Sequence, residues 1–185
     1  FGNYCTGGIV GKLDGEFTTG LDFSNTSNIR KSSNDGLILC TSDTSDSTLT
    51  GKYFGGIVGY GYQALVHESY SASGRASNFS FNYGKTDLLK GKYVGGIIGY
   101  GQSSLISNCS TQKNGYVLGS EQVGGIAGAL EGNVSEAIQA EGNIKVTTNA
   151  SYVIGNNYVG GIVGENSSGV TLENCVNNGV AAGYK

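Results

Sequence analysis

The chain has 185 residues, including 33 Gly, and it lacks Pro, Met and Trp. Its formal net charge is −3, from 11 basic and 14 acidic residues, and no cluster of Lys and Arg suggests a nucleic-acid partner. Gly does not recur at every third position with Pro, which excludes collagen, and no apolar run approaches the roughly 20 residues of a membrane helix.

The pattern Gly-Gly-Ile-x-Gly recurs along the whole chain. Its five copies lie at residues 7–11, 55–59, 95–99, 124–128 and 160–164. Such repetition is typical of arrays in which each unit packs on its neighbours. The shortest interval, from Gly95 to Gly124, sets the basic repeat, and the longer intervals carry insertions. We therefore treat residues 1–185 as a single repeat domain.

In the first repeat, residues 12–34 form a predicted insertion rich in Ser, Thr and Asn. Leu37 to Cys40 then forms a predicted second strand. Asp43 and Asp46 follow in a polar stretch that lacks the glycines of calcium-binding repeats, so we expect a solvated loop there and no metal site.

In the second repeat, Leu65 to Ser69 takes the place of the second strand and contains His67, the only histidine. No metal-type cluster of His and Cys surrounds it, so we expect an exposed strand residue with no catalytic role. Residues 74–90 form the second predicted insertion, in which aromatic and polar residues alternate as in a strand or hairpin. The aromatic residues are Phe79, Phe81 and Tyr83.

The later repeats show the same order of segments. Their second strands are predicted at Leu105 to Ser110, Val134 to Ala137 and Thr171 to Val176. A third segment has the form Gly-x-Val-x-Gly, as in Gly115 to Gly119. Each repeat therefore holds about three short strands, separated by Gly, Asn and Ser.

These strands favour an all-β, right-handed parallel β-solenoid of about five rungs with two inserted loops or hairpins. A rung of short strands cannot bury its apolar face alone, whereas stacked rungs about 4.8 Å apart bury a continuous core. The five cores should then lie in adjacent parallel strands. A two-sheet sandwich is the alternative, while a helical fold is excluded by the missing 3.6-residue period.

Stacking predicts a core column of isoleucines, which consists of Ile9, Ile57, Ile97, Ile126 and Ile162. Strict alternation would place Ile97 and Ile98 on opposite faces, unless a bulge at the paired glycines buries both.

Tyrosines fall into two further columns. Tyr53, Tyr93 and Tyr158 form one, interrupted by Gln122, and Tyr60 and Tyr100 form the other. Such an aromatic ladder is able to bind sugar rings or another protein. The favoured interpretation is that these rings stabilise neighbouring rungs.

Cysteines form a column in alternate rungs, with Cys40, Cys109 and Cys175 in rungs one, three and five, and Ser69 and Ala137 between them. Two rungs separate neighbouring cysteines by about 9.6 Å, beyond the Cα separation of about 7 Å that a disulfide tolerates. We therefore expect no bridge among these three cysteines.

Asn-x-Ser/Thr sequons mark candidate N-glycosylation sites if the source has a secretory pathway. They lie at Asn25, Asn78, Asn108, Asn133, Asn149 and Asn166.

The Gly-Gly-Ile-Val-Gly core, the Ile-Ser-Asn-Cys segment at 106–109 and the Gly-x-Val-x-Gly segment together resemble the GLUG-motif repeats of large bacterial surface proteins. The resemblance covers all five cores and most of the chain outside the two insertions. It implies an extracellular or cell-surface β-solenoid stalk or adhesin segment, and it supplies no catalytic residues.

We therefore expect a non-enzymatic structural or adhesive protein without cofactor or metal. The alternative is a carbohydrate-binding or carbohydrate-cleaving β-helix, which would show aromatic residues or carboxylates converging on a groove. Because Met is absent, we expect a processed or partial product. Neither end shows a feature that would block an open strand edge, so we expect both ends to stack on further rungs of a longer chain or on identical copies in a head-to-tail filament. Host or matrix glycans are further candidate partners.

Overall fold

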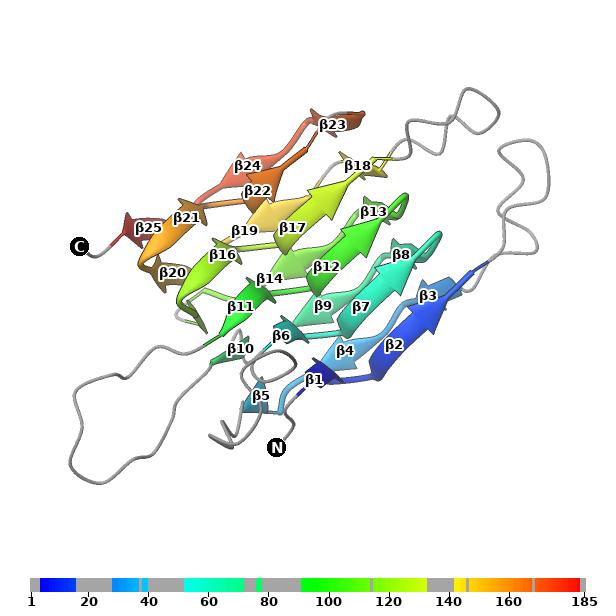
Figure 1. Ribbon diagram of the computed structural model, residues 1–185, viewed down its shortest axis with the longest axis horizontal. Helices are drawn as coiled ribbons and strands as arrows, with labels where there is room; N and C mark the ends of the chain where they lie inside the picture. Colours follow the sequence, from blue (N-terminus) through cyan, green and yellow to red (C-terminus); the bar gives the residue numbers. More distant parts are fainter. Residues whose placement is uncertain are drawn as a thin grey trace.

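The computed structural model describes residues 4–15, 28–36, 38–39, 52–71, 76–77, 91–113, 115–132, 142–145, 147–167 and 169–183. Over these ranges the chain contains strands and turns but no helix, and therefore no helix that could cross a membrane. The strands form five stacked rungs, and each rung contributes one strand to each of five sheets. Figure 1 shows the rungs in succession from the N-terminal to the C-terminal end.

All pairs in these sheets are parallel and join neighbouring rungs. The first sheet contains β1 (Tyr4–Gly7), β6 (Lys52–Gly55), β11 (Lys92–Gly95), β16 (Glu121–Gly124) and β21 (Asn157–Gly160). The second contains β2 (Val10–Asp14), β7 (Val58–Tyr62), β12 (Ile98–Gln102), β17 (Ala127–Glu131) and β22 (Val163–Asn166).

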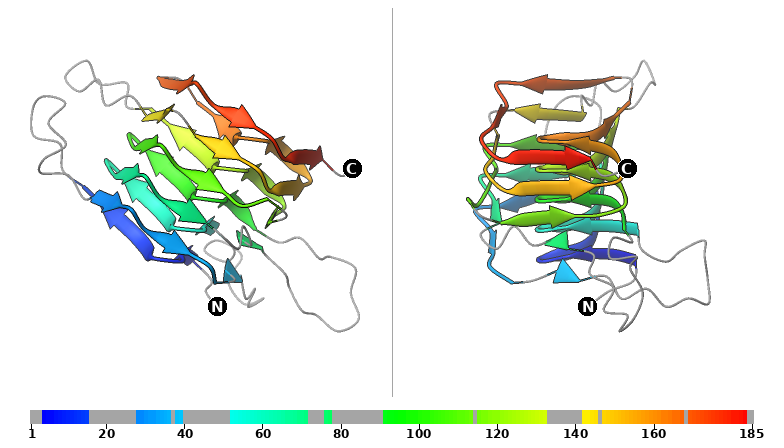
Figure 2. Two further views of the ribbon diagram at one scale, coloured as in Figure 1. Left: turned by 180° about the vertical axis from the view of Figure 1, so that it is seen from behind. Right: turned by 90° about the vertical axis from the view of Figure 1, so that its left-hand side faces the viewer.

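The other three sheets complete each rung and return the chain to the first sheet (Figure 2). The third contains β3 (Asn28–Arg30), β8 (Leu65–His67), β13 (Leu105–Ser107), β18 (Gly142–Lys145) and β23 (Val170–Glu173). The fourth contains β4 (Ser33–Asn34), β9 (Tyr70–Ser71), β14 (Ser110–Thr111), β19 (Thr148–Asn149) and β24 (Val176–Asn177). The fifth contains β5 (Ile38–Leu39), β10 (Ala76–Ser77), β15 (Tyr116–Leu118), β20 (Tyr152–Gly155) and β25 (Val180–Gly183).

The register confirms the parallel β-solenoid. The first glycines of the five motifs pair directly from rung to rung, in the order Gly7, Gly55, Gly95, Gly124 and Gly160. No pair among the described strands is antiparallel, as a sandwich built from hairpins would require.

The repeated motif forms a tight inward turn between the first and second sheets. A Cβ atom on Gly55 would lie 1.8 Å from the carbonyl oxygen of Val58, so only glycine allows the chain to fold back here. The next residue, Gly56, crosses the interior, and a Cβ on it would lie 2.5 Å from Ser71 Oγ on the opposite wall. The motif therefore requires its paired glycines for steric reasons.

This inward turn separates the apolar interior into two clusters. The larger is built around the isoleucine column and includes Ile57, Ile97 and Ile126, each with 0% exposure. The neighbouring Ile98 is also 0% exposed, so the turn buries both Ile97 and Ile98. The smaller cluster consists of Ile38, Phe54, Val94, Val117, Val123 and Val153.

Each rung has five strands rather than the predicted three, and residues with positive φ recur in columns both within and between these strands. One column of such residues interrupts the first sheet, with φ between 48° and 63° at Cys5, Tyr53, Tyr93, Gln122 and Tyr158. A second column follows the third sheet, with φ between 49° and 51° at Lys31, Glu68, Asn108 and Asn174. The second column marks the corner between the third and fourth sheets, and in both columns non-glycine residues adopt this conformation only under tertiary constraint.

The predicted insertion at residues 12–34 is too long. Its beginning belongs to β2, and its end forms β3 and β4, which pair with the second rung. The predicted insertion at 74–90 is also too long, because β10 pairs with both β5 and β15. The strand or hairpin predicted at Phe79, Phe81 and Tyr83 lies outside the described residues.

Two predicted second strands were also assigned wrongly. In the first rung, Asn28–Arg30 pairs with Leu65–His67, whereas Ile38 belongs to the fifth sheet. In the fourth rung, Ile144 pairs with both Ile106 and Leu172, so β18 takes the place assigned to Val134 to Ala137. Apolar content alone misled these alignments, because both true segments contain one isoleucine among polar residues.

Candidate functional site

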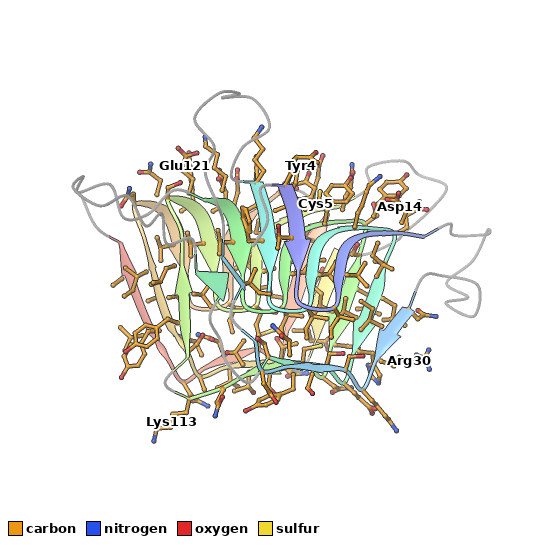
Figure 3. The ribbon with its side chains drawn as sticks, turned by 90° about the horizontal axis from the view of Figure 1, so that it is seen from below. Tyr4, Cys5, Asp14, Arg30, Lys113 and Glu121 are labelled. Atoms are coloured by element: carbon orange, nitrogen blue, oxygen red, sulfur yellow. The ribbon has the colours of Figure 1, made fainter. Side chains whose placement is uncertain are left out.

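The predicted tyrosine columns lie on the outer surface of the first two sheets. The register aligns Tyr60 directly with Tyr100, and the pairs on either side align Tyr53 with Tyr93. Figure 3 looks along the stack from the first rung; Tyr4, Cys5 and Asp14 of that rung and Glu121 of the fourth rung lie toward this side of the cross-section.

The structure joins the two columns into one aromatic cluster, which spacing alone did not predict. Tyr53 stacks on Tyr93 with ring centroids 5.1 Å apart, and Tyr60 stacks on Tyr100 at 5.5 Å. Edge-to-face contacts of 5.3 to 5.4 Å link the columns, and Tyr4 meets the edge of Tyr53 in the same way. We call Tyr4, Tyr53, Tyr60, Tyr93 and Tyr100 the tyrosine cluster. Tyr158 lies beyond Gln122 and is 62% exposed.

Within each column a ring stacks face to face on the ring of the next rung, whereas the two columns meet edge to face. The interplanar angle is 8° between Tyr60 and Tyr100 and 24° between Tyr53 and Tyr93. On the other side of Tyr60, the Lys12 ammonium lies 5.7 Å from the ring centroid. A sugar stacks on an open aromatic face, so these contacts favour a cluster that holds rungs together.

Hydrogen bonds and partial burial act on several phenols of the cluster. The Tyr60 hydroxyl donates to Gln102 Oε1 at 3.2 Å, and the Tyr100 hydroxyl donates to the Glu131 carboxylate. Burial raises the pKa of Tyr53 to about 12. Burial, and then the bond to Glu131, raise the pKa of Tyr100 well above its usual value. Tyr53 and Tyr100 therefore hold their phenolic protons more tightly than an exposed tyrosine does.

A second column, which the sequence reasoning missed, is polar and is buried except at its last member, Asn177. We call it the polar ladder, and it consists of Asn34, Ser71, Thr111, Asn149 and Asn177. Its members face the second glycine of each motif across the interior. For example, a Cβ on Gly125 would lie 2.3 Å from the Asn149 side chain. The recurring Asn-x-Gly and Asn-x-Ser signals at 34, 149 and 177 mark this column in the sequence.

Hydrogen bonds within and between rungs satisfy most of the polar ladder. Asn149 Nδ2 donates to Asn177 Oδ1 at 2.8 Å, and Asn149 Oδ1 accepts from Thr111 Oγ1 and from the amide and hydroxyl of Ser151. Asn34 closes a similar turn with Gly36. Ser71 is the exception, because its buried Oγ has no partner among the described residues.

The cysteine column is confirmed at Cys109 and Cys175 but is otherwise revised. The register places Ser32, Ser69, Cys109, Thr147 and Cys175 in line, so Ser32 and Thr147 replace the predicted Cys40 and Ala137. Cys109 and Cys175 are free, as predicted, and Cys40 lies outside the described residues. Burial raises the pKa of the Cys109 thiol to about 11, which fits an inert core position.

His67 is the last residue of β8, between β3 and β13 in the third sheet, and is half-buried. Its Nδ1 lies 2.6 Å from Ser107 Oγ, and its Nε2 lies 3.4 Å from Glu68 Oε1. Within the described ranges, no group of three or more His, Cys, Asp or Glu side chains is placed to hold a metal ion. Asp43 and Asp46 lie outside these ranges.

The predicted sequons differ in accessibility. Asn108 and Asn166 are exposed, the former at a corner and the latter at the end of β22. Asn149 is fully buried in the polar ladder, so a glycan at this position is incompatible with the fold. Asn25, Asn78 and Asn133 lie outside the described residues.

Comparison with known proteins found no match for this chain among protein-family models, curated proteins or solved structures. The resemblance to GLUG-motif repeats therefore stays a prediction.

Proposed function

We propose that this chain is a structural β-solenoid segment that extends a rod on the cell surface or outside the cell. The observation that supports the proposal most directly is that side chains in equivalent positions contact one another along the axis of the stack. The isoleucine column lies in one core cluster that spans the rungs, and the tyrosines and the amides of Asn149 and Asn177 contact the same position of the next rung. Such columns stabilise a stack of rungs, and each added rung contributes further contacts of the same kind.

The surface location is supported by the resemblance of the five repeated cores to GLUG-motif repeats. An adhesive role fits the same architecture, because a rod holds further domains or exposed loops away from a surface. The carbohydrate-binding alternative draws less support from the tyrosine cluster, since its stacked rings already use their faces on one another.

A tandem fusion of two copies, with Lys185 joined to Phe1, tests the rod. Connections between the fifth and first sheets already vary in length, so this corner tolerates added residues. We expect small-angle X-ray scattering to show one rod that is longer than the single copy by about 24 Å, from five rungs at about 4.8 Å each. Two independently moving bodies would contradict the proposal.

Tyrosine fluorescence during titration with oligosaccharides provides the complementary test. We expect no saturable change for the native chain. A saturable change that disappears in Tyr100→Ala, but persists in the distant control Tyr116→Ala, would favour the carbohydrate-binding alternative.

A further inference from the structure

We propose that Tyr116 and Tyr152 form a site of oxidative cross-linking, at which a peroxidase couples the two phenol rings into dityrosine. The product joins the third rung covalently to the fourth. The inference goes beyond the proposed rod, because it adds a chemical modification and needs only two neighbouring rungs of one chain.

The two tyrosines are direct neighbours on the outside of the fifth sheet. Tyr116 in β15 pairs with Tyr152 in β20, and their ring centroids lie 5.2 Å apart at an interplanar angle of 20°. The next residues, Val117 and Val153, also pair and are both 0% exposed in the smaller core cluster, which fixes the register of the two strands. Folding thus holds the rings together before any reaction, and this favours coupling within one chain.

Both rings are open to an oxidant in solution. Tyr116 is 39% exposed and Tyr152 is 36% exposed. The stacked pairs of the tyrosine cluster are partly buried by comparison, and the Tyr60 and Tyr100 hydroxyls are held by hydrogen bonds. Close stacking and exposure therefore coincide at Tyr116 and Tyr152.

Tyr70 shows what exposure provides without a stacked partner. It is 37% exposed on the fourth sheet, where it aligns with Ser33 in the first rung and Ser110 in the third. The same oxidant reaches this ring, but the aligned positions on both sides hold hydroxyl side chains in place of a phenol. Tyr70 is therefore an internal control for accessibility.

The oxidant is hydrogen peroxide acting through a haem peroxidase. Each phenol loses one electron to the peroxidase and one proton to water, which leaves a phenoxyl radical on each ring. The radicals form a carbon–carbon bond between the ring positions next to the hydroxyl-bearing carbons. Those two carbons then release their protons, and the two oxygens take up protons again. Hydrogen peroxide accepts the two electrons with two protons and becomes two molecules of water.

Peptide mass spectrometry of the full chain after peroxidase treatment tests the cross-link. Trypsin cleavage after Lys113 and Lys145 gives peptide 114–145, in which Tyr116 is the only tyrosine, and peptide 146–185, which contains Tyr152. We expect these peptides to be joined, with a mass two hydrogen atoms below their sum, and to show dityrosine fluorescence. The yield should be equal in dilute and concentrated protein, because the reaction is intramolecular.

Phenylalanine variants separate this pair from the other tyrosines. Tyr116→Phe and Tyr152→Phe keep the stacked rings, and each should abolish the joined peptide. Tyr93→Phe removes a phenol from an equally close pair in the tyrosine cluster, and Tyr70→Phe removes an exposed phenol. Both of these controls should leave the yield of joined peptide unchanged.

Urea unfolding measures the consequence for stability. The treated native chain should unfold at a higher urea concentration than the untreated chain, because the new bond closes the loop of residues 116–152 in the unfolded state. Treated Tyr116→Phe should show no such shift.

A treated native chain that yields no joined peptide overturns the inference. So does a joined peptide that still forms in Tyr152→Phe, or one whose yield rises with protein concentration. These outcomes leave the tandem fusion unaffected, since the length of its rod does not depend on oxidation.

Discussion

The inner rungs and the end rungs contain the same motif but place it in different surroundings. Ile57, Ile97 and Ile126 are completely buried between neighbours, whereas Ile9 in the first rung is 47% exposed. In the polar ladder, Asn149 is fully buried and Asn177 in the last rung is exposed. The contribution of a residue to the free energy of unfolding depends on whether a rung lies on both sides of it. The same substitution should therefore change stability by different amounts at different positions of one column.

The largest difference is expected in the isoleucine column. Ile97→Ala should lower the free energy of unfolding by about 4 kcal/mol, because it leaves a cavity between two rungs. Ile9→Ala should cost about 1 kcal/mol, since about half of that side chain is already in water. Urea unfolding of both variants measures the difference, and equal losses would contradict the dependence on position.

The second glycine of the motif provides the next comparison. A Cβ on Gly96 would lie 2.2 Å from the Gly125 carbonyl oxygen, so Gly96→Ala should cost about 3 kcal/mol through forced backbone movement. A Cβ on Gly161 would meet only the exposed Asn177 side chain, so Gly161→Ala should cost less than about 1 kcal/mol. Gly183→Ala, with open space around it, is the control for thermal unfolding.

The polar ladder should show a smaller contrast. Asn149→Ala removes the acceptor of the Thr111 and Ser151 hydroxyls and should cost about 2 kcal/mol. Asn177→Ala should change stability by no more than about 0.5 kcal/mol, because water replaces its bonds. Guanidinium unfolding is the measurement. Equal losses at Asn149 and Asn177 would contradict the dependence on burial.

The smallest effect concerns pH. The pKa of Tyr53 is about 12 in the folded chain against 10.0 for an unperturbed tyrosine, so the folded state holds its proton longer than the unfolded state. This contribution to stability is complete below about pH 10 and is lost as pH rises toward about 12.

Tyr53→Phe should therefore reduce the fall in stability over this range while keeping the ring contacts. Tyr158→Phe, exposed in the last rung, is the control. Chemical unfolding at a series of alkaline pH values measures how the free energy of unfolding falls with pH. The same fall in Tyr53→Phe as in the native chain would count against a neutral, partly buried phenol at this position.

The sequence predicted the parts of the fold that repeat. Five copies of one motif were enough to infer stacked parallel rungs, and the pairing of Gly7 with Gly55 and onward confirms it. The tyrosine columns also followed from alignment of the motifs. Their merger into one cluster did not, because it depends on how far the inward turn brings the first and second sheets together.

Segments without a strong motif were assigned less well. Asn28–Arg30 has one apolar residue between polar neighbours, so the more hydrophobic Leu37 to Cys40 seemed the better second strand. Burial of Ile29 in the larger core cluster and pairing with Leu65–His67 decide otherwise. In a narrow interior, one inward-facing apolar side chain is enough to hold such a short strand in the core. The average hydrophobicity of the segment does not reveal it.

The sequence by itself determined the repeat, the parallel stacking and the requirement for paired glycines, because these are properties of each motif and recur in every copy. Only the tertiary structure decided which residues face one another across the interior. Gly125 meets Asn149 there, although the two strands β17 and β18 and the chain between them separate these residues in sequence. The path between them varies from rung to rung, and the meeting point is set by closure of the rung and by hydrogen bonds to its neighbours.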